Sequence, residues 1–446
     1  MPVCSTQNPT LDANPREKSN MEAMPDYSPR IIDETLEAHL KSFGAVSVEG
    51  PKWCGKTTTC LQHANTFVDV SDPAGDYALR ELAKIDPYQL FKGTPPVLVD
   101  EWSLVPSIWD AARHEVDRSR KRGQLLLSAS TTPRKTYHSG AGRIARLAMR
   151  TMTLAETGAS SKQVSLKALL DGEKASGTCD ASLDAILDAV CRGGWPETQD
   201  DPLDIALPLP EQYVSTLLDL RENDDPDAPK VDPVKMRALV RSLARNTAQT
   251  VSKAVICKDA GEDSLESESS PSYNTTLRYY DILKRLYIVE EQPAWDPALR
   301  SPVRVRSTPK MHLTDPSLAV AGLGASPERL ARDPKTLGTL FETHCYRDLD
   351  VYARSFGASV LHYRDNSDLE VDVIIERKDG SWGAFEVKLG PAQIENAAKH
   401  LHALERKMVE GGQEPPVCKC VVVGTFSHAY TREDGVQVVP LLALAP

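Results

Sequence analysis

Residues 50–57 constrain the fold of this chain more than any other segment. They read G-P-K-W-C-G-K-T, which fits the phosphate-loop pattern G-x-x-x-x-G-K-[ST]. The preceding A-V-S-V-E is expected to form a strand, and the residues after the loop are expected to form a helix. Because strand, loop and helix occur in the order that the pattern requires, we interpret the segment as a phosphate-binding loop rather than a chance glycine-rich turn.

Each position of this loop has an expected role in binding ATP and Mg²⁺. The glycines allow backbone N–H groups to turn toward the phosphates, the Lys56 ammonium neutralises phosphate oxygens, and the Thr57 hydroxyl is a ligand for Mg²⁺. The residues expected to contact the nucleotide here are Gly50, Pro51, Lys52, Trp53, Cys54, Gly55, Lys56, Thr57 and Thr58.

Two acidic residues follow the next apolar run. The segment P-P-V-L-V is typical of a buried parallel strand, and Asp100 and Glu101 come directly after it. Asp100 is expected to hold the same Mg²⁺ through water, and Glu101 to polarise an attacking water molecule. This pair favours ATP hydrolysis over passive binding, with Lys56 and Glu101 as catalytic residues.

A third expected strand, Q-L-L-L-S-A-S, carries Ser128 and Ser130 at its end. Either hydroxyl could sense the γ-phosphate, and we place Ser130 at the nucleotide; simple strand capping is the alternative. Arg143 and Arg150 follow. Either one could act in trans on a neighbour's nucleotide, although surface solvation is favoured for each taken alone.

A second group of charged residues lies near the C-terminus. Asp372 ends the run E-V-D, and Glu386 and Lys388 share one face of the expected strand A-F-E-V-K. Two carboxylates and a lysine on adjacent strands can hold Mg²⁺ at Asp372 and Glu386 and orient a water molecule at a phosphodiester. Glu342, in L-F-E-T-H on the preceding helix, is a further candidate. Surface salt bridges on a sheet are the alternative.

The middle of the chain is expected to be mainly helical. Residues 234–247 and 274–289 have helical patterns, and the second runs into a strand, which suggests a helix-turn-helix with a wing. A basic stretch without acids follows, and it either contacts phosphates or forms a solvated face. Its members are Arg300, Arg304, Arg306 and Lys310.

The composition limits the classes of protein that fit. A chain of 446 residues is expected to form two to four domains, and no run reaches the roughly 18 apolar residues of a membrane helix. Nine scattered cysteines and the absence of a secretory signal favour a reducing, cytoplasmic location and no membrane partner. The net charge of −11 leaves DNA binding open, because a basic groove can coexist with an acidic whole.

The order of the motifs resembles prokaryotic AAA-type (AAA+) ATPases with a C-terminal domain of unknown function that has a restriction-endonuclease-like, PD-(D/E)xK core. The resemblance rests on G-P-K-W-C-G-K-T-T, V-L-V-D-E-W, L-S-A-S, S-G-A-G-R-I-A-R-L-A-M-R-T-M-T-L-A-E, T-T-L-R-Y-Y-D-I-L-K-R-L-Y-I-V, G-T-L-F-E-T, and E-V-D with F-E-V-K. It implies ATP binding at residues 50–57, Walker B roles for Asp100 and Glu101, and a winged-helix module. It also implies a nuclease-like site, made of Glu342, Asp372, Glu386 and Lys388.

We therefore expect an α/β protein with a P-loop NTPase domain, a helical middle with a winged helix, and a restriction-endonuclease-like α/β domain. The expected boundaries are a disordered tail at 1–30 and domains at 31–160, 161–330 and 331–446. The expected function is ATP hydrolysis that controls a DNA-binding or nuclease-like module, in a chain that could form homo-oligomers. The alternative is an ATP-dependent regulatory or scaffold protein whose catalytically silent nuclease-like fold binds protein partners.

Overall fold

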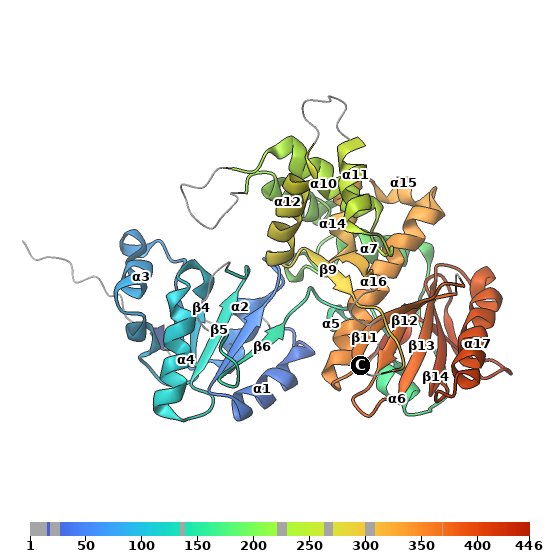
Figure 1. Ribbon diagram of the computed structural model, residues 1–446, viewed down its shortest axis with the longest axis horizontal. Coiled ribbons are helices and arrows are strands. Elements are labelled where there is room, and N and C mark those ends of the chain that lie inside the picture. Colours follow the sequence, from blue (N-terminus) through green and yellow to red (C-terminus); the bar gives the residue numbers. More distant parts are fainter. Residues whose placement is uncertain are drawn as a thin grey trace, which may run out of the picture. The chain divides into compact units, whose positions relative to one another are not determined.

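The computed structural model in Figure 1 describes residues 16–17, 27–133, 139–220, 230–262, 271–298, 308–367 and 369–446. The chain divides into two compact units. The first is built mainly from Asp33–Gly50 and Lys56–Met149, and the second from Ser28–Ile32, Pro51–Gly55 and Arg150–Pro446. The predicted tail, residues 1–30, lies largely outside the described residues. Within the described ranges, no helix is long and apolar enough to cross a membrane.

The first unit contains a six-stranded sheet in the order β1-β3-β4-β5-β2-β6. Five neighbouring strands are parallel, and β1 (Arg16–Glu17) pairs antiparallel with β3 at the edge. The parallel strands are β2 (Ala45–Glu49), β3 (Thr66–Asp69), β4 (Val97–Asp100), β5 (Leu125–Ala129) and β6 (Ile144–Ala148). The prediction of an α/β unit with a parallel sheet is confirmed.

The strands of this sheet are apolar because both faces are covered. Every residue of β5 is buried, as expected for a central parallel strand. Trp109 of α4 shares a hydrophobic core with Val99 and Leu127, whereas Leu98 and Leu126 are buried on the opposite face. The helices of this unit are α1 (Ile32–Ser42), α2 (Lys56–His63), α3 (Ala74–Ile85) and α4 (Ser107–Ser119), shown in blue and cyan in Figure 1.

The order of the strands indicates that a ligand-binding site lies at the edge of the sheet formed by the carboxyl ends of the strands. Strand β2, which leads into residues 50–57, lies between β5 and β6, while β4 lies on the far side of β5. In open parallel sheets, ligands bind beyond the carboxyl ends of the strands where the strand order reverses. Gly50, Asp100 and Ser130 each follow or end a strand at this edge.

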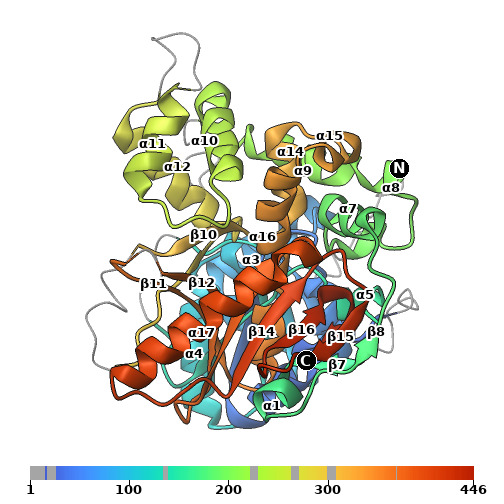
Figure 2. The same cartoon turned by 90° about the vertical axis from the view of Figure 1, so that its right-hand side faces the viewer.

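The second unit begins with a helical part. Helices α10, α11 and α12 pack against one another and form a distinct group in Figure 2. An antiparallel ribbon of β9 (Val289–Gln292) and β10 (Lys310–Leu313) follows them. The helices up to this ribbon are α5 (Leu154–Thr157), α6 (Leu166–Leu170), α7 (Leu183–Arg192), α8 (Leu203–Ala206), α9 (Pro208–Leu217), α10 (Pro233–Arg245), α11 (Lys253–Glu262) and α12 (Tyr273–Arg285). The helices expected around 234–247 and 274–289 are thus present, and the second leads to a strand as expected.

The C-terminal part of the second unit contains a seven-stranded mixed sheet in the order β11-β12-β13-β14-β16-β15-β8. Its strands are β11 (Ser359–Arg364), β12 (Glu370–Glu376), β13 (Trp382–Lys388), β14 (Cys418–Val423), β15 (His428–Thr431), β16 (Gln437–Pro440) and β8 (Gly177–Thr178). The predicted strands at β11, β12, β13 and β14 are confirmed. The pairing of β8 with β15, and of β7 (Val164–Ser165) with β17 (Leu444–Ala445), was not foreseen.

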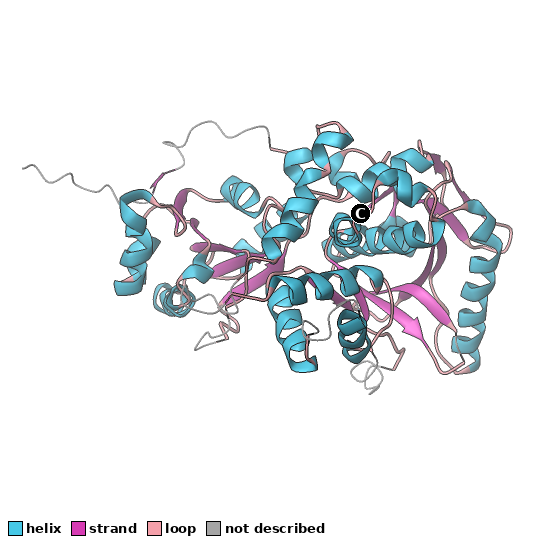
Figure 3. Ribbon diagram, turned by 90° about the horizontal axis from the view of Figure 1, so that it is seen from above, coloured by secondary structure: helices cyan, strands magenta, loops and turns pink. Residues whose placement is uncertain are grey.

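Two long helices cover opposite faces of this sheet, as Figure 3 shows in cyan against the magenta strands. Phe341 of α16 (Pro334–Ser355) shares a core with Phe385 of β13, and Leu401 of α17 (Ile394–Glu410) shares a separate core with Val421 of β14. Helices α14 (Pro316–Leu323) and α15 (Pro327–Ala331) connect the ribbon to α16.

Candidate functional site

A hydroxyl and a carboxylate meet at the carboxyl edge of the first sheet. Thr57 lies in the first turn of α2, and Asp100 is the last residue of β4. The Thr57 hydroxyl donates to the Asp100 carboxylate, with Oγ1 2.9 Å from Oδ2. Oxygen ligands of this kind suit Mg²⁺, which prefers one or two protein oxygens together with phosphate oxygens. The donor set therefore fits the metal that the sequence analysis predicts here.

Burial changes the acidity of Asp100. Burial raises the pKa of its carboxyl to about 6, against hydrogen bonds from Ser128 and Thr57 that lower it, while the charge of Glu101 raises it further. The Ser128 hydroxyl donates to the same carboxylate. A buried carboxylate that disfavours its own charge is suited to a position beside a cation, whose field stabilises the ionised form.

Glu101 has a strained backbone and a fixed side chain. Its φ of 51° lies in the left-handed region, which costs free energy for a residue with a Cβ atom and is common at functional sites. Its carboxylate accepts hydrogen bonds from the Ser130 hydroxyl at 3.0 Å and from the Ser130 N–H at 3.3 Å. The structure thus brings together Asp100 with Ser128 and Glu101 with Ser130.

The loop between β2 and α2 includes Pro51–Gly55, which belong to the second unit. Trp53 and Gly55 have positive φ values of 62° and 95°, so the chain turns twice through the left-handed region. Within the second unit, the backbone N–H of Lys52 donates to the Tyr213 hydroxyl at 3.1 Å. The Trp53 ring packs edge-on against the Tyr213 ring, with centroids 5.3 Å apart.

The second candidate site lies where β12 and β13 separate. The pairing of the two strands ends at Val373 and Phe385, and β12 carries an irregular register against β11 around Asp372. Beyond this point the N–H of Val387 donates to the side-chain carboxylate of Asp372 at 2.9 Å rather than to the backbone of β12. A bulge of this kind re-aims one side chain, here Asp372, into the gap between strands.

The predicted C-terminal residues form one cluster with the geometry expected of neighbouring strands. The Lys388 ammonium lies 3.1 Å from Asp372 and 2.5 Å from Glu386. His400 of α17 has its Nδ1 atom 3.6 Å from the other Glu386 oxygen. Glu342, on α16, joins the same cluster through an ion pair with one further lysine, which was not expected to lie there.

That residue is Lys310, the first residue of β10. Its side chain is 1% exposed, and its ammonium lies 2.6 Å from Glu342, 3.4 Å from Asp372 and 3.4 Å from Glu370. The prediction that Lys310 contacts phosphates or lies on a solvated face is therefore wrong, because three carboxylates surround it. The other members of the predicted basic stretch, Arg300, Arg304 and Arg306, lie outside the described residues.

Backbone pairing explains how Lys310 reaches this position. Lys310 is directly opposite Gln292 in the ribbon of β9 and β10. The Gln292 side-chain amide donates to the backbone oxygens of Leu361 at 2.8 Å and Asp372 at 3.0 Å. The ribbon is thus fastened to the irregular part of β12, and its first β10 residue enters the carboxylate cluster.

In this cluster, burial and the neighbouring charges shift the pKa values of the side chains in opposite directions. Burial raises the pKa of Glu342 to about 7, and the neighbouring Asp372 charge adds to this rise. Burial also raises the pKa of Glu386. Burial alone would raise the pKa of Asp372, but the ammonium groups of Lys310 and Lys388 and a backbone hydrogen bond together lower it. The pKa of Lys310 rises although burial opposes its charge, because three carboxylates outweigh burial.

The two arginines proposed to act in trans have different environments. Arg143 is exposed, and its Nε lies 2.8 Å from the Asp117 carboxylate, so surface solvation is confirmed for it. Arg150 is buried in the second unit, where its guanidinium lies 2.5 Å from Glu290 and 3.0 Å from Asp350. The surface interpretation is wrong for Arg150, because it neutralises two carboxylates inside the fold.

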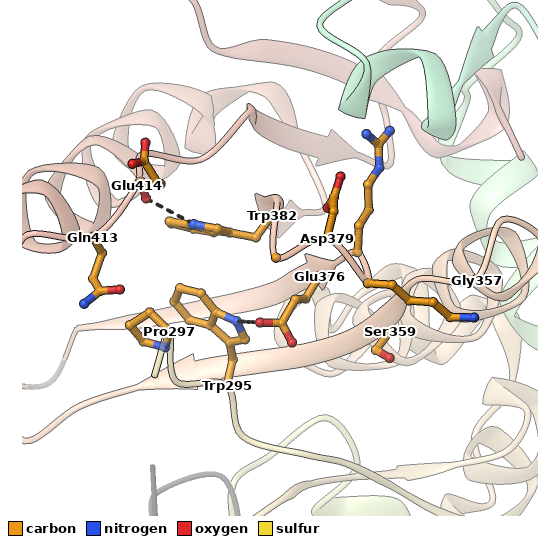
Figure 4. A pocket seen from close by; sticks show the side chains of 12 residues that line it. Trp295, Pro297, Gly357, Ser359, Glu376, Asp379, Trp382, Gln413 and Glu414 are labelled. Atoms are coloured by element: carbon orange, nitrogen blue, oxygen red, sulfur yellow. Dashed lines mark hydrogen bonds between the residues drawn. The ribbon is translucent and has the colours of Figure 1, made fainter. Parts of the chain in front are cut away.

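A cavity of about 430 Å³ lies at the other end of β12 and β13 (Figure 4). Trp295 and Trp382 form one wall, with ring centroids 4.5 Å apart. Their indole N–H groups donate to the Glu376 carboxylate and to the backbone oxygen of Glu414. Both rings are buried and both N–H groups are bonded, so these tryptophans stabilise the hairpin end and offer little surface to a ligand.

Comparison with known proteins identifies two domains of unknown function. Residues 183–329 match the domain family DUF8612, and residues 337–444 match the domain family DUF4143. No curated protein matches the chain. The first match covers helices α7 to α12, the ribbon and α14, and the second covers most of α16 and strands β11 to β16.

Proposed function

We propose that this chain binds and hydrolyses ATP as an AAA-type P-loop protein, and that its nucleotide state controls the DNA-binding or nuclease-like C-terminal part. The observation that carries the proposal is the hydrogen bond from Thr57 to Asp100 beside Glu101 at the carboxyl edge of a parallel sheet. When bound there, Mg²⁺ would supply positive charge to the phosphate oxygens of ATP.

The position of Lys56 supports phosphate binding. Lys56 is buried and begins α2, directly after the positive-φ residue Gly55. A helix N-terminus presents free N–H groups and a partial positive charge, and a lysine there adds a full charge. The match to DUF4143, a domain often found with AAA-type ATPases, is consistent with this proposal.

The contacts of Glu101 support hydrolysis. A general base must be held within reach of the water molecule that it activates. Two donors on Ser130 fix one oxygen of Glu101, and among the described residues no hydrogen bond ends on its other oxygen, which can accept one from water. We infer that Glu101 is the base and Ser130 its positioning residue.

The helical part supports a role in DNA binding. Three packed helices followed by a two-stranded ribbon are compatible with the proposed winged helix, in which α12 would be the recognition helix. Arg278 and Lys284 are exposed on α12 and are the residues that would contact phosphates, although Asp281 is exposed between them and Glu291 lies 2.6 Å from the Lys284 ammonium. The alternative, a regulatory protein with a silent nuclease-like fold, is favoured by one observation: Lys310 and Lys388 already neutralise the C-terminal carboxylates. Homo-oligomers and a cytoplasmic location remain part of the proposal.

Steady-state ATPase rates test the proposal. We expect Lys56→Ala and Glu101→Gln to abolish turnover, with Glu101→Gln retaining bound ATP. Lys41→Ala, which removes an exposed lysine of the same unit, is the matched control and should keep the wild-type rate. Unchanged turnover in Glu101→Gln would refute the hydrolytic mechanism.

Adding DNA to the same assay tests the coupling. Turnover that depends on Lys56 and rises with DNA supports a nucleic-acid-dependent ATPase. Turnover that depends on Lys56 but ignores duplex, branched and single-stranded DNA would contradict coupling to DNA and favour the regulatory alternative.

A further inference from the structure

The C-terminal cluster contains its own cation. Mg²⁺ bound by carboxylates needs oxygens at about 2.1 Å in near-octahedral geometry. The Lys310 ammonium instead lies among the oxygens of Glu342, Asp372 and Glu370, at 2.6 to 3.4 Å. A divalent ion does not fit among these oxygens while the ammonium is present, because the two positive charges would occupy the same space and repel each other.

We propose that Lys310 is the resident cation of the carboxylate cluster and excludes divalent metal from it. The ribbon of β9 and β10 delivers this charge, and the Gln292 contacts with the backbone of Leu361 and Asp372 fix its position. The proposal concerns residues of the second unit and does not depend on ATP hydrolysis.

Two further observations support a fixed position for Lys310. The side chain is fully buried, so it cannot leave the cluster without movement of the ribbon. Two residues along β10, the buried His312 bonds through Nε2 to the Gln292 side-chain oxygen at 3.0 Å and stacks on Tyr346 of α16, with centroids 4.1 Å apart. The ribbon is therefore held at two points. Gln292 of β9 bonds to the backbone of β11 and β12, and His312 of β10 stacks on α16.

The consequence is that removal of the Lys310 charge converts the cluster into a metal site. Lys310→Met leaves Glu342, Glu370 and Asp372 without the ammonium that they share, while Lys388 stays beside Asp372 and Glu386. Carboxylates in this arrangement repel each other unless a cation joins them. Mn²⁺, which accepts the same oxygen ligands as Mg²⁺, is then expected to bind.

Calorimetric titration of the full chain with Mn²⁺, without nucleotide, tests the proposal. All proteins carry Asp100→Asn, so that the first unit contributes no metal ligand from that position. We expect Lys310→Met to bind one Mn²⁺ at least tenfold more tightly than the parent and Lys310→Arg. Equal affinity of the parent and Lys310→Met, or no binding by a folded Lys310→Met protein, would overturn the proposal.

A charge-matched variant keeps the test decisive if Lys310→Met folds but is too unstable for calorimetric titration. Lys310→Met combined with Glu342→Gln removes one positive and one negative charge from the closest pair of the cluster. We expect this double variant to melt at a higher temperature than Lys310→Met, and Mn²⁺ to raise the melting temperature of Lys310→Met but not of the parent. A double variant no more stable than Lys310→Met, together with no Mn²⁺ effect, would mean that Lys310 does not act as a cation here.

Discussion

Ser130 donates two hydrogen bonds to Glu101, one from its hydroxyl and one from its backbone N–H, and both end on the same carboxylate oxygen. The two residues directly follow the neighbouring parallel strands β4 and β5, and their side chains meet beyond the sheet. The left-handed backbone of Glu101 directs its side chain toward Ser130 rather than along its own strand. This pair joins the expected base of ATP hydrolysis to the residue expected to sense the nucleotide.

Ser130→Ala should therefore lower kcat without raising KM. One hydrogen bond to the Glu101 carboxylate is lost while the backbone bond remains, and a bond to a charged group is worth about 1.5 to 3 kcal/mol. We expect a fall in kcat of roughly tenfold or more. Ser130→Thr, which keeps a hydroxyl, should restore most of the rate. Steady-state kinetics check this, and an unchanged kcat for Ser130→Ala would show that the hydroxyl does not position Glu101.

The raised pKa of Asp100 predicts a pH-dependent stability. The pKa rises from 3.8 to about 6 because the carboxyl is buried. Between these values, the folded protein holds a proton that the unfolded chain has released, so the free energy of unfolding falls as pH rises. The total is about 3 kcal/mol, and the loss ends above about pH 6.

Asp100→Asn removes this titration. Relative to the wild type, the variant should gain about 3 kcal/mol of unfolding free energy between pH 4 and pH 7. Urea denaturation without Mg²⁺ or nucleotide, followed by the fluorescence of the buried Trp102 and Trp109 of the same unit, measures the difference. Parallel pH profiles for the two proteins would show that Asp100 titrates normally.

Much of the first site could be predicted because local patterns determine it. The run V-L-V-D ends a buried strand, so the carboxylate of Asp100 had to lie at the carboxyl edge of the sheet. Thr57 follows a glycine-rich turn that opens a helix, which places its hydroxyl at the same edge. Their contact follows from strand order, which alternation of strands and helices indicates.

The position of Lys310 could not be predicted, because it depends on contacts between distant segments. The charge pattern around Lys310 is that of a solvated face. Its burial results from pairing with Gln292 and from the bulge at Asp372, and no local pattern encodes either contact. The strands β7 and β8 have two residues each, which is too short for an alternation of apolar and polar residues. The sequence therefore does not indicate that they pair with C-terminal strands.

Arg347 should be essential for the stability of the second unit. Its guanidinium lies 2.9 Å from Asp315 and 2.8 Å from Asp348, and all three side chains are buried. Arg347→Met leaves two buried carboxylates without their cation, which costs about 3 to 5 kcal/mol. Arg354→Met is the matched control on the same helix, because Arg354 is 53% exposed and should cost less than about 1 kcal/mol. Chemical denaturation compares the two, and equal losses would contradict a special role for burial.

Replacing glycine by alanine is expected to change the stability of the protein in opposite directions at Gly194 and at Gly338, two positions of the second unit. A Cβ atom at Gly194 would lie 2.0 Å from the backbone oxygen of Met152, whose N–H donates to the Gly194 oxygen. Backbone cannot move away without breaking this bond, so Gly194→Ala should destabilise the protein by about 1 to 3 kcal/mol. Gly338 lies inside α16 with open space around a Cβ atom.

Gly338→Ala should therefore stabilise the protein by about 0.5 to 1 kcal/mol, because alanine loses less backbone freedom in a helix than glycine. Thermal denaturation of both variants beside the wild type measures the effects. The opposite signs matter more than the sizes, since both changes add the same methyl group and differ in what surrounds it. A stabilising Gly194→Ala would mean that the segments around Met152 and Gly194 do not approach as closely as described, and a destabilising Gly338→Ala would mean that α16 is packed on that side.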